Sequence, residues 1–290
     1  MRLGALETGG TKMVCAIGDE NGNIFKEKTI PTRKPDETIP EIITFFKDEN
    51  VDALGIACFG PIDLDRGSKT YGYITSTPKR EWADFDIVGS FKKALNVPVG
   101  FDTDVNGSLL GEVTFGSAKG LSDVVYITVG TGIGGGVISN GNLLHGMLHP
   151  ELGHMLVTKH PDDPHESVCP FHESCLEGLA SGPSIRARYG KGGEELTGER
   201  KVWEIEAYYL SQAVVNIILT LSPKRIIFGG SVMKQAVLFD LIRDNVTKML
   251  NGYIKADELK DIGSYIVPES LGGKQGILGC FKLAEMEYEL

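Results

Sequence analysis

The sequence predicts an α/β protein built from two related lobes. The chain has 290 residues, which is enough for about two compact domains that each bury a core. Apolar segments with strand and helix patterns alternate along its length. The order of these segments near the N-terminus is repeated from Asp123 onward. Such a repeat indicates that the second half has the same plan as the first.

The first half opens with three strand-like segments, which we expect to form an antiparallel meander because Gly-Gly and Asn-Gly turns separate them. A helix follows, and then a buried strand that ends in Gly60-Pro61. After an irregular stretch and a second helix, a short strand runs into Asp102-Thr103-Asp104. The expected strands are Arg2–Glu7, Met13–Ile17, Ile24–Thr29, Ala53–Phe59 and Val97–Phe101. The first helix is expected from the apolar pattern Ile39, Ile42, Ile43 and Phe46, and the other two are expected at Ile87–Leu95 and Gly107–Val113.

The second half repeats a strand, a glycine-rich turn and a strand, as at the start of the chain. We expect the two lobes at residues 1–118 and 119–290, with the last helix able to pack back on the first lobe. The expected strands are Val124–Val129, Val137–Ser139, Leu143-Leu144 and Arg225–Phe228, the turn is Gly130–Gly136, and the helices are Val202–Leu221, Ala236–Leu250 and one that begins at Gln275.

Composition and charge narrow the class of protein. Hydrophobic residues make up 41% of the chain and charged residues 23%, as in ordinary globular proteins. We expect a cytoplasmic protein that does not bind membranes, because there is no signal-like N-terminus and no apolar run of about 20 residues. A net charge of −10 with scattered basic residues argues against nucleic acid as a partner. Cys15, Cys58 and Cys280 are expected to be small buried side chains in a reducing compartment.

Two turns rich in Gly and Thr, Thr8–Thr11 and Gly130–Gly136, join strand to strand. Such turns expose backbone N–H groups with no side chain in the way, which suits phosphate. The second turn also fits the dinucleotide pattern GxGxxG, but the residues after it predict a strand where that motif needs a helix. Either turn alone would pass for a tight hairpin. Two at matching places favour a phosphate site in each half.

These motifs resemble, in their order, those of the ROK family of sugar kinases and repressors. The matching segments are Glu7–Lys12, Phe59–Asp63, Asp102–Asn106, Gly130–Gly136 and Glu151–His154. The resemblance covers nearly the whole chain, and Gly4–Gly18 with its Glu7 is most similar to the bacterial fructokinases. It implies an actin-like ATPase (ribonuclease H-like) fold of two α/β lobes, with ATP and sugar in the cleft between them. It also suggests a homodimer, for which the long helices of the second half are candidate surfaces.

A kinase needs an acceptor for the proton of the sugar hydroxyl and an in-line geometry. The resemblance implies that Asp104 is this base. From the residue types alone, an Asp between a strand and a helix is more often a helix N-cap, although Asp102 or Asn106 can take that role. Phosphoryl transfer also needs Mg²⁺, and Glu7 is the candidate to hold the ion, directly or through water.

The resemblance further implies where ATP and the sugar bind. We expect Gly182-Pro183 and Gly229-Gly230 on the adenine side, although each also fits an ordinary turn. Lys12 is a phosphate neighbour or a solvated strand residue. The expected phosphate-binding residues are Gly9, Gly10, Thr11, Lys12, Gly130, Thr131, Gly132 and Gly134, and the expected sugar-binding residues are Gly60, Pro61, Asp104, Asn106, Glu151, His154 and Glu177.

His154, Cys169, His172 and Cys175 are four ligands of the right type for a tetrahedral Zn²⁺ site. The alternative is a merely buried pair of cysteines with solvent-exposed histidines. The polar, Pro-containing segment 159–167 has few residues to bury, so a metal explains its order better. His160 and His165 compete with His172 for the fourth place. One nitrogen of a zinc-bound His154 leaves the other free to meet a sugar hydroxyl in a fixed tautomer.

The sequence therefore predicts an ATP-dependent hexose kinase, with fructose favoured over glucose or mannose as substrate. A sugar-responsive repressor is the main rival from another class. It would need a DNA-binding helix-turn-helix ahead of a phosphate loop that begins by residue 7, and we expect no room for one. A sugar sensor without catalysis would not need two phosphate loops and Asp104.

Overall fold

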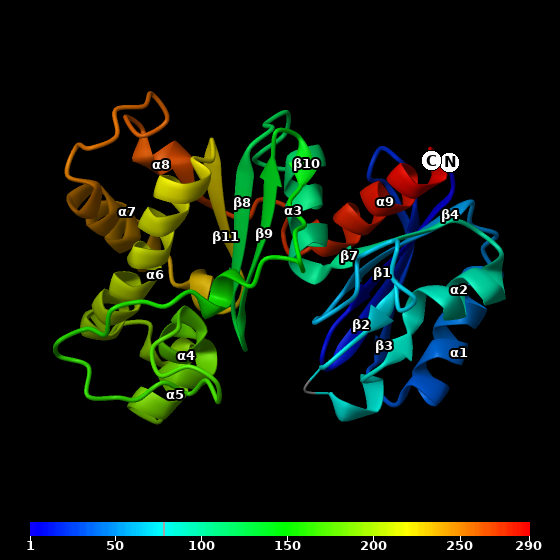
Figure 1. The fold of residues 1–290 in the computed structure, drawn as a ribbon, viewed down its shortest axis with the longest axis horizontal. Coiled ribbons are helices and arrows are strands. Elements are labelled where there is room, and N and C mark those ends of the chain that lie inside the picture. The colour runs from blue at the N-terminus through cyan, green and yellow to red at the C-terminus, as the bar shows by residue number, and fades with distance from the viewer. Residues whose placement is uncertain (78) are drawn as a thin grey trace. The chain divides into compact units, whose positions relative to one another are not determined.

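The computed structural model describes residues 1–77 and 79–290, and the chain divides into two compact units (Figure 1). Unit 1 contains Met1–Gly120, His145–His149 and Ser270–Leu290. Unit 2 contains Leu121–Leu144 and Pro150–Glu269. The first boundary follows Gly120, and the terminal helix α9 (Gln275–Tyr288) belongs to unit 1.

Unit 1 is built on a five-stranded sheet of order β3-β2-β1-β4-β7. The first three strands pair antiparallel, so the meander expected from the turns is confirmed, while β4 pairs parallel with β1 and with β7. The strands are β1 (Leu3–Thr8), β2 (Lys12–Gly18), β3 (Ile24–Pro31), β4 (Ala53–Cys58) and β7 (Val99–Thr103), and the helices besides α9 are α1 (Pro35–Lys47), α2 (Ile87–Leu95) and α3 (Asp104–Thr114).

Helices cover both faces of this sheet, because successive side chains on a strand point to opposite sides. Leu6 and Ile56 belong to one apolar cluster with residues of α1 and α2. Ala5 and Ala57 belong to another with residues of α9. Small residues on this second face allow α9 to approach closely: a Cβ on Gly55 would overlap the backbone of Cys280.

Unit 2 repeats the topology of unit 1, with a sheet of order β10-β9-β8-β11-β12. Its first three strands are again antiparallel and its last two join in parallel. The predicted relationship between the two halves is thus confirmed at the level of strand order. The strands are β8 (Val124–Val129), β9 (Ile133–Ser139), β10 (Asn142–Leu143), β11 (Arg225–Gly229) and β12 (Ile266–Pro268).

Helices α6 (Arg200–Leu221) and α7 (Val237–Leu250) supply much of the apolar core of unit 2, together with two shorter helices that the sequence pattern did not predict. Those are α4 (Leu176–Ala180) and α5 (Gly182–Tyr189). The remaining elements are the two-stranded β5 (Tyr73–Ile74) and β6 (Phe85–Asp86), α8 (Ile262–Tyr265), and the short 3₁₀ helices η1 (Arg80–Trp82), η2 (Leu152–His154), η3 (Gly193–Leu196) and η4 (Val232–Lys234).

Two expectations about the local structure were wrong. The turn predicted at Gly130–Gly136 ends at Gly132, because Gly134, Gly135 and Gly136 pair with β8 as part of β9. The continuing strand rules out the dinucleotide-binding helix at this position. Helix α3 begins at Asp104 rather than Gly107, since Thr103 caps it. In the described part of the chain, no helix is long and apolar enough to cross a membrane.

Candidate functional site

The first glycine loop leaves backbone donors available for an anion. Thr32 uses its hydroxyl to bind the carbonyl of Gly9 at 2.7 Å and its N–H to bind the carbonyl of Thr11 at 2.9 Å. Lys79 Nζ donates to the carbonyl of Gly10. The three carbonyls are thus occupied from within unit 1, whereas no described residue accepts from the N–H groups of Gly10 or Thr11. This is the arrangement that an anion-binding loop requires.

The second loop, Gly130–Gly132, has the same property. The carbonyl of Gly130 accepts the N–H of Gly182 at 2.7 Å, and the carbonyl of Gly132 accepts the N–H of Gly130 at 2.9 Å. Within the described residues, the N–H groups of Thr131 and Gly132 have no acceptor. Gly134 lies beyond the loop, paired with Thr128 in the sheet.

A cavity of about 530 Å³ in unit 2 adjoins this second loop. It brings together four residues that the sequence predicted for ATP, namely Gly130, Thr131, Gly182 and Pro183. The predicted pair Gly229-Gly230 directly precedes Ser231, which lines the cavity. Gly230 has φ = 94°, and a Cβ there would overlap the backbone of Val129. The residues that complete the lining were not predicted: Arg186, Gly192, Gly193, Glu194, Ser231, Val232, Lys234 and Gln235.

Gln235 fixes one wall of this cavity. Its side chain is almost fully buried, and its Nε2 donates to the carbonyl of Gly193 at 3.0 Å and to Thr197 Oγ1 at 3.1 Å. These contacts join the start of η3 to the residue that follows η4. The wall therefore consists of two segments about 40 residues apart that one amide holds together.

Asp104 occupies the first turn of α3, at the end of β7. The sequence left the helix cap open between Asp104, Asp102 and Asn106, and none of these is the cap. Thr103 is, and its Oγ1 accepts the N–H of Asn106 at 3.2 Å. Asp104 is half-buried, and its Oδ1 accepts the N–H of Val105 at 2.9 Å.

Beside Asp104 lies a cluster that the sequence did not predict. His145 Nε2 is 2.9 Å from Asp102 Oδ2, and Asn106 Nδ2 donates to Asp102 Oδ1 at 2.7 Å. Asp102 and Asn106 are buried, and the hydrogen bond to Asp102 raises the pKa of the His145 imidazole. With its amide nitrogen turned to Asp102, Asn106 keeps a buried Oδ1 that has no partner among the described residues. A buried acceptor without a partner is suited to bind a hydrogen-bond donor such as a hydroxyl.

His149 approaches the predicted sugar-binding turn Gly60-Pro61, whose peptide bond is cis. The backbone N–H of Ile62 donates to His149 Nε2 at 3.4 Å, and the imidazole would lie 3.4 Å from a Cβ on Gly60. His149 is buried. The only hint in the sequence was the recurrence of histidine at 145, 149 and 154 around Glu151.

The four predicted zinc ligands converge in unit 2. One ligand atom from each of His154, Cys169, His172 and Cys175 lies within 4.8 Å of every other. His154 Nδ1 is 3.6 Å from the sulfur of Cys175 and 3.9 Å from that of Cys169. Neither His160 nor His165 belongs to the group. The Nδ1 of His160 instead accepts the N–H of Asp162 at 3.1 Å.

Glu177 connects this cluster to the second glycine loop. Its Oε1 is 3.9 Å from His154 Nε2, the ring nitrogen that faces away from the cysteines. Its Oε2 accepts the N–H of Ile133, directly after the loop, at 2.9 Å. Glu151 is exposed and stands just before η2. Three of the residues predicted for the sugar therefore belong to unit 2, close to the metal-ligand cluster.

Glu7 is the penultimate residue of β1, next to the first loop, but its carboxylate faces another element. A Cβ on Gly276, at the start of α9, would lie within 2.7 Å of the carboxylate atoms of Glu7. The N-terminus of a helix is a favourable place for a negative charge. Glu7 is half-buried, and Lys12 is exposed at the start of β2.

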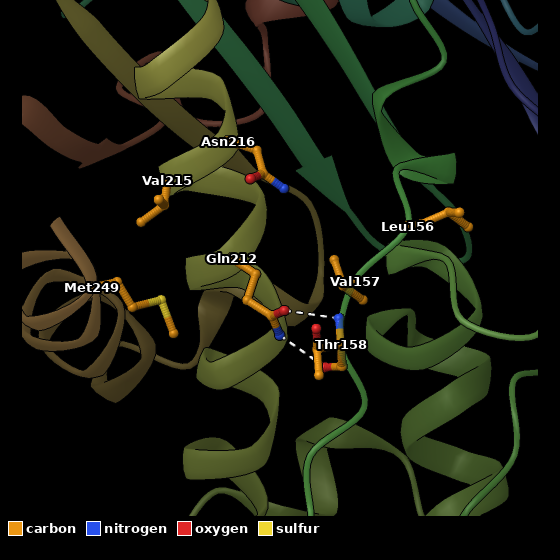
Figure 2. A pocket seen from close by; sticks show the side chains of 7 residues that line it. All are labelled: Leu156, Val157, Thr158, Gln212, Val215, Asn216 and Met249. Atoms are coloured by element: carbon orange, nitrogen blue, oxygen red, sulfur yellow. Dashed lines mark hydrogen bonds between the residues drawn. The ribbon is translucent and has the colours of Figure 1, made fainter.

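A separate cavity of about 370 Å³ lies between the chain after η2 and helices α6 and α7 (Figure 2). Gln212 holds its rim by binding both the N–H and the carbonyl of Thr158, at 2.8 and 3.0 Å. The side chains that line it are uncharged: Leu156, Val157, Thr158, Gln212, Val215, Asn216 and Met249. Without a titratable group, this cavity is not suited to phosphoryl transfer.

Comparison with known proteins agrees with this geometry. The sequence pattern that defines the ROK family matches residues 3–287. A fructokinase of Lactococcus lactis subsp. cremoris is 46% identical over 283 residues, which cover 97% of this chain and 96% of the relative. A fructokinase of Pediococcus pentosaceus is 45% identical over 285 residues, which cover 98% of each.

Among solved structures, a ROK hexokinase from Thermus thermophilus matches with a TM-score of 0.80 and 25% identity, over 100% of this chain and 99% of that one. The two-unit α/β architecture is therefore that of the ROK kinases, as the sequence predicted. The family match and the two relatives each extend over nearly the entire chain, and the chain belongs to the ROK family.

Proposed function

We propose that this protein transfers the γ-phosphoryl group of ATP to a hexose, and that fructose is the preferred acceptor. The observation that carries the reaction type is the pair of glycine loops. The three carbonyls of the first loop and two carbonyls of the second accept hydrogen bonds, and both loops have backbone N–H groups left for phosphate. The choice of fructose is supported by relatives named fructokinase that are 45% and 46% identical over nearly the full chain.

Asp104 is the proposed general base. Phosphoryl transfer relies mainly on positioning and on offsetting charge, so the protein has to hold the acceptor hydroxyl and accept its proton. A carboxylate fixed at the end of a buried strand, in the first turn of a helix that Thr103 caps, meets both needs. The buried Oδ1 of Asn106 is a matching acceptor for a second sugar hydroxyl.

Mg²⁺ would neutralise the β- and γ-phosphate oxygens when bound with ATP. Glu7, the penultimate residue of the strand before the first loop, is the residue proposed to hold it. Because the Glu7 carboxylate faces the start of α9, we favour contact through water, which Mg²⁺ commonly retains. ATP itself is proposed to place its adenine in the cavity of unit 2 that Gln235 closes.

The cluster of His154, Cys169, His172 and Cys175 is proposed to bind Zn²⁺. The residues fit this ion: two thiols and two imidazoles offer ligand atoms within 4.8 Å of one another, as a closed tetrahedral site requires. A zinc bound there would have a structural role. His154 would use Nδ1 for the metal and present Nε2 beside Glu177, and Glu151, His154 and Glu177 would read the sugar hydroxyls.

The experiment that tests the function is a coupled assay of ADP release with Mg-ATP and equal concentrations of fructose, glucose and mannose. We expect kcat/KM for fructose to exceed the other two by at least about tenfold, the discrimination that one well-placed hydrogen bond supplies. A higher kcat/KM for glucose or mannose than for fructose would still support a hexose kinase but would refute fructose as the preferred substrate. No turnover with any hexose, in a protein that binds sugar, would favour a regulator.

Two further properties are proposed with this function. The enzyme works in the cytoplasm, where the thiols of its metal cluster stay reduced. It forms a homodimer through the apolar face around the cavity of Figure 2, where Leu156 is 67% exposed and Met249 40% exposed. Light scattering after gel filtration measures the mass, and Leu156→Lys is expected to lower it from about 63 kDa, twice the 31.4 kDa of one chain.

A further inference from the structure

Lys79 lies on the first glycine loop and is not among the residues that the sequence predicted for ATP. Its Nζ donates to the carbonyl of Gly10, and its Cε would be 3.0 Å from a Cβ on that residue. Lys79 directly precedes η1. The buried Trp82 ends this short helix and donates from Nε1 to the carbonyl of Arg33 at 2.9 Å. The Lys79 ammonium therefore contacts the loop from a segment that the hydrogen bond of Trp82 holds in place.

The charge of Lys79 has no counterion among the residues of unit 1 that the structure describes. Two of its basic neighbours are paired: Arg33 with Glu41 at 2.8 Å, and Lys34 with Glu81 at 3.4 Å. Among the described residues, Lys79 makes no ion pair. It is half-buried, and an ammonium has three donors, of which the Gly10 carbonyl takes one. Two donors and a full positive charge remain for a ligand.

The space beside Lys79 can receive an anion. A cavity of about 340 Å³ is lined by Thr32, Arg33, Lys79, Arg80, Glu81 and Trp82. Next to it, the N–H groups of Gly10 and Thr11 have no acceptor in the described structure. In a chain of net charge −10, such a local positive site is what draws a phosphate group in.

We propose that Lys79 binds the γ-phosphoryl group of ATP and holds it during transfer. This inference rests on the proposed hexose kinase reaction. It selects the γ-phosphoryl group because unit 1 carries both Lys79 and the candidate base Asp104, whereas the cavity suited to adenine belongs to unit 2. The group that the sugar hydroxyl attacks as its proton passes to Asp104 is the γ-phosphoryl group.

The role of Lys79 in this step is electrostatic. The bond between the γ-phosphorus and the bridging oxygen breaks, and ADP leaves with the electron pair. A bond forms between the phosphorus and the sugar oxygen, whose proton passes to Asp104. The ammonium keeps its protons and offsets the negative charge on the oxygens of the moving group, as cationic side chains do in other phosphoryl transfers.

The decisive variant is Lys79→Gln, which can still donate to the Gly10 carbonyl but has no charge. We expect its affinity for the Mg complex of the non-hydrolysable analogue AMPPNP to fall about 10- to 100-fold, the effect of losing one charge-assisted hydrogen bond. Affinity for Mg-ADP, which lacks the γ-phosphate, should change less than about twofold. Titration calorimetry measures both. The value of kcat/KM for ATP should fall with AMPPNP affinity while KM for fructose stays constant.

Two matched variants complete the test. Lys79→Arg keeps the charge and should recover most of the activity. Lys34→Gln removes an exposed charge that pairs with Glu81, two residues after Lys79, and should behave as the wild type. Equal weakening of AMPPNP and ADP by Lys79→Gln would show that Lys79 only shapes the loop. Unchanged AMPPNP affinity would also overturn the proposal. Since the binding comparison needs no turnover, it stands even if no hexose is phosphorylated.

Discussion

Asp104 shows how one residue can fit two roles until its neighbours are known. A strand end followed by a helix is the usual place for a capping aspartate, but the structure gives that task to Thr103. Since the cap is occupied, replacing the Asp104 carboxylate should leave the helix intact. A change in activity can then be assigned to the chemistry.

We therefore expect Asp104→Asn to lower kcat about 10²- to 10⁴-fold, the usual contribution of a general base. The variant should keep its melting temperature and its KM for fructose within about threefold, because asparagine preserves the shape and one acceptor oxygen. Steady-state kinetics and thermal melting measure these quantities. If the turnover of Asp104→Asn were close to that of the wild type, Asp104 could not be the general base.

Glu206, on α6, carries a second prediction at this scale. It is fully buried, and neither carboxylate oxygen has a partner among the described residues. Burial raises its pKa well above the ordinary 4.5; nearby Asp163 adds to the shift, while Arg188 opposes it. The folded protein thus retains a proton that the unfolded chain releases. The stabilisation is complete below about pH 4.5 and is lost as the pH rises through the higher folded-state pKa.

Glu206→Gln should abolish this dependence, because an amide does not titrate. We expect the melting temperature of the variant, relative to the wild type, to rise progressively above about pH 4.5, by about 2–4 °C for each kcal/mol of relief. The control is Glu204→Gln on the same helix, where the exposed side chain pairs with Arg200 at 2.9 Å. A constant difference between Glu206→Gln and the wild type at all pH values would contradict the argument.

At the scale of elements, the segment from Lys159 to Ser174 shows how a stretch with few apolar residues is held in place. Its first part is fixed by Asp163, which is buried, lies 2.9 Å from Arg188 Nη2 and accepts the hydroxyl of Tyr209 at 2.7 Å. Its second part contains Cys169 and His172, with the exposed Phe171 between them. Hydrogen bonds from Ser167 Oγ to the carbonyl of His172, at 2.7 Å, and from the N–H of Val168 to the carbonyl of Gly178, at 2.9 Å, hold part of it. We expect the proposed metal to supply the rest of its order.

We expect the wild-type protein to contain about one zinc per chain, and the double variant Cys169→Ser, Cys175→Ser to contain none. Without the metal, amide exchange should accelerate in residues 165–175 but much less around Asp163, whose contacts do not involve the cluster. Elemental analysis and hydrogen exchange measure the two effects, and Cys15→Ala serves as the control for a lost thiol elsewhere. If elemental analysis found no zinc in the wild-type protein, the proposed zinc site would be wrong.

Elements were predictable from the sequence where a pattern was long or chemically distinctive. Helix α2 and strand β8 have the predicted bounds, because apolar periodicity and flanking turn residues both mark them. Helix α4 has only five residues, too few to show a period. Asn106 and His145 are 39 residues apart in sequence, and only the folded chain brings them together. The cavity wall held by Gln235 was missed for the same reason.

At the scale of the whole molecule, helix α9 determines whether the core of unit 1 is complete. Helix α9 belongs to unit 1, although residues 150–269 of unit 2 separate it from most of that unit. Its buried residues include Ile277, Cys280, Phe281 and Ala284, which share an apolar cluster with β1 and β4. Unit 1 therefore cannot complete its core until the residues of α9 have been made.

The close packing of α9 against its neighbours offers a way to destabilise unit 1 alone. A Cβ on Gly279 would overlap the backbone of Gly107 in α3, so Gly279→Val should destabilise unit 1 by about 1–3 kcal/mol or more through overpacking. Hydrogen exchange should accelerate in β1 and β4 but not in β8 and β11. The control is Gly198→Ala, where a Cβ meets nothing within 4 Å. If β8 and β11 lose protection to the same extent as β1 and β4, the two units unfold together and the core of unit 1 is not an independent element of stability.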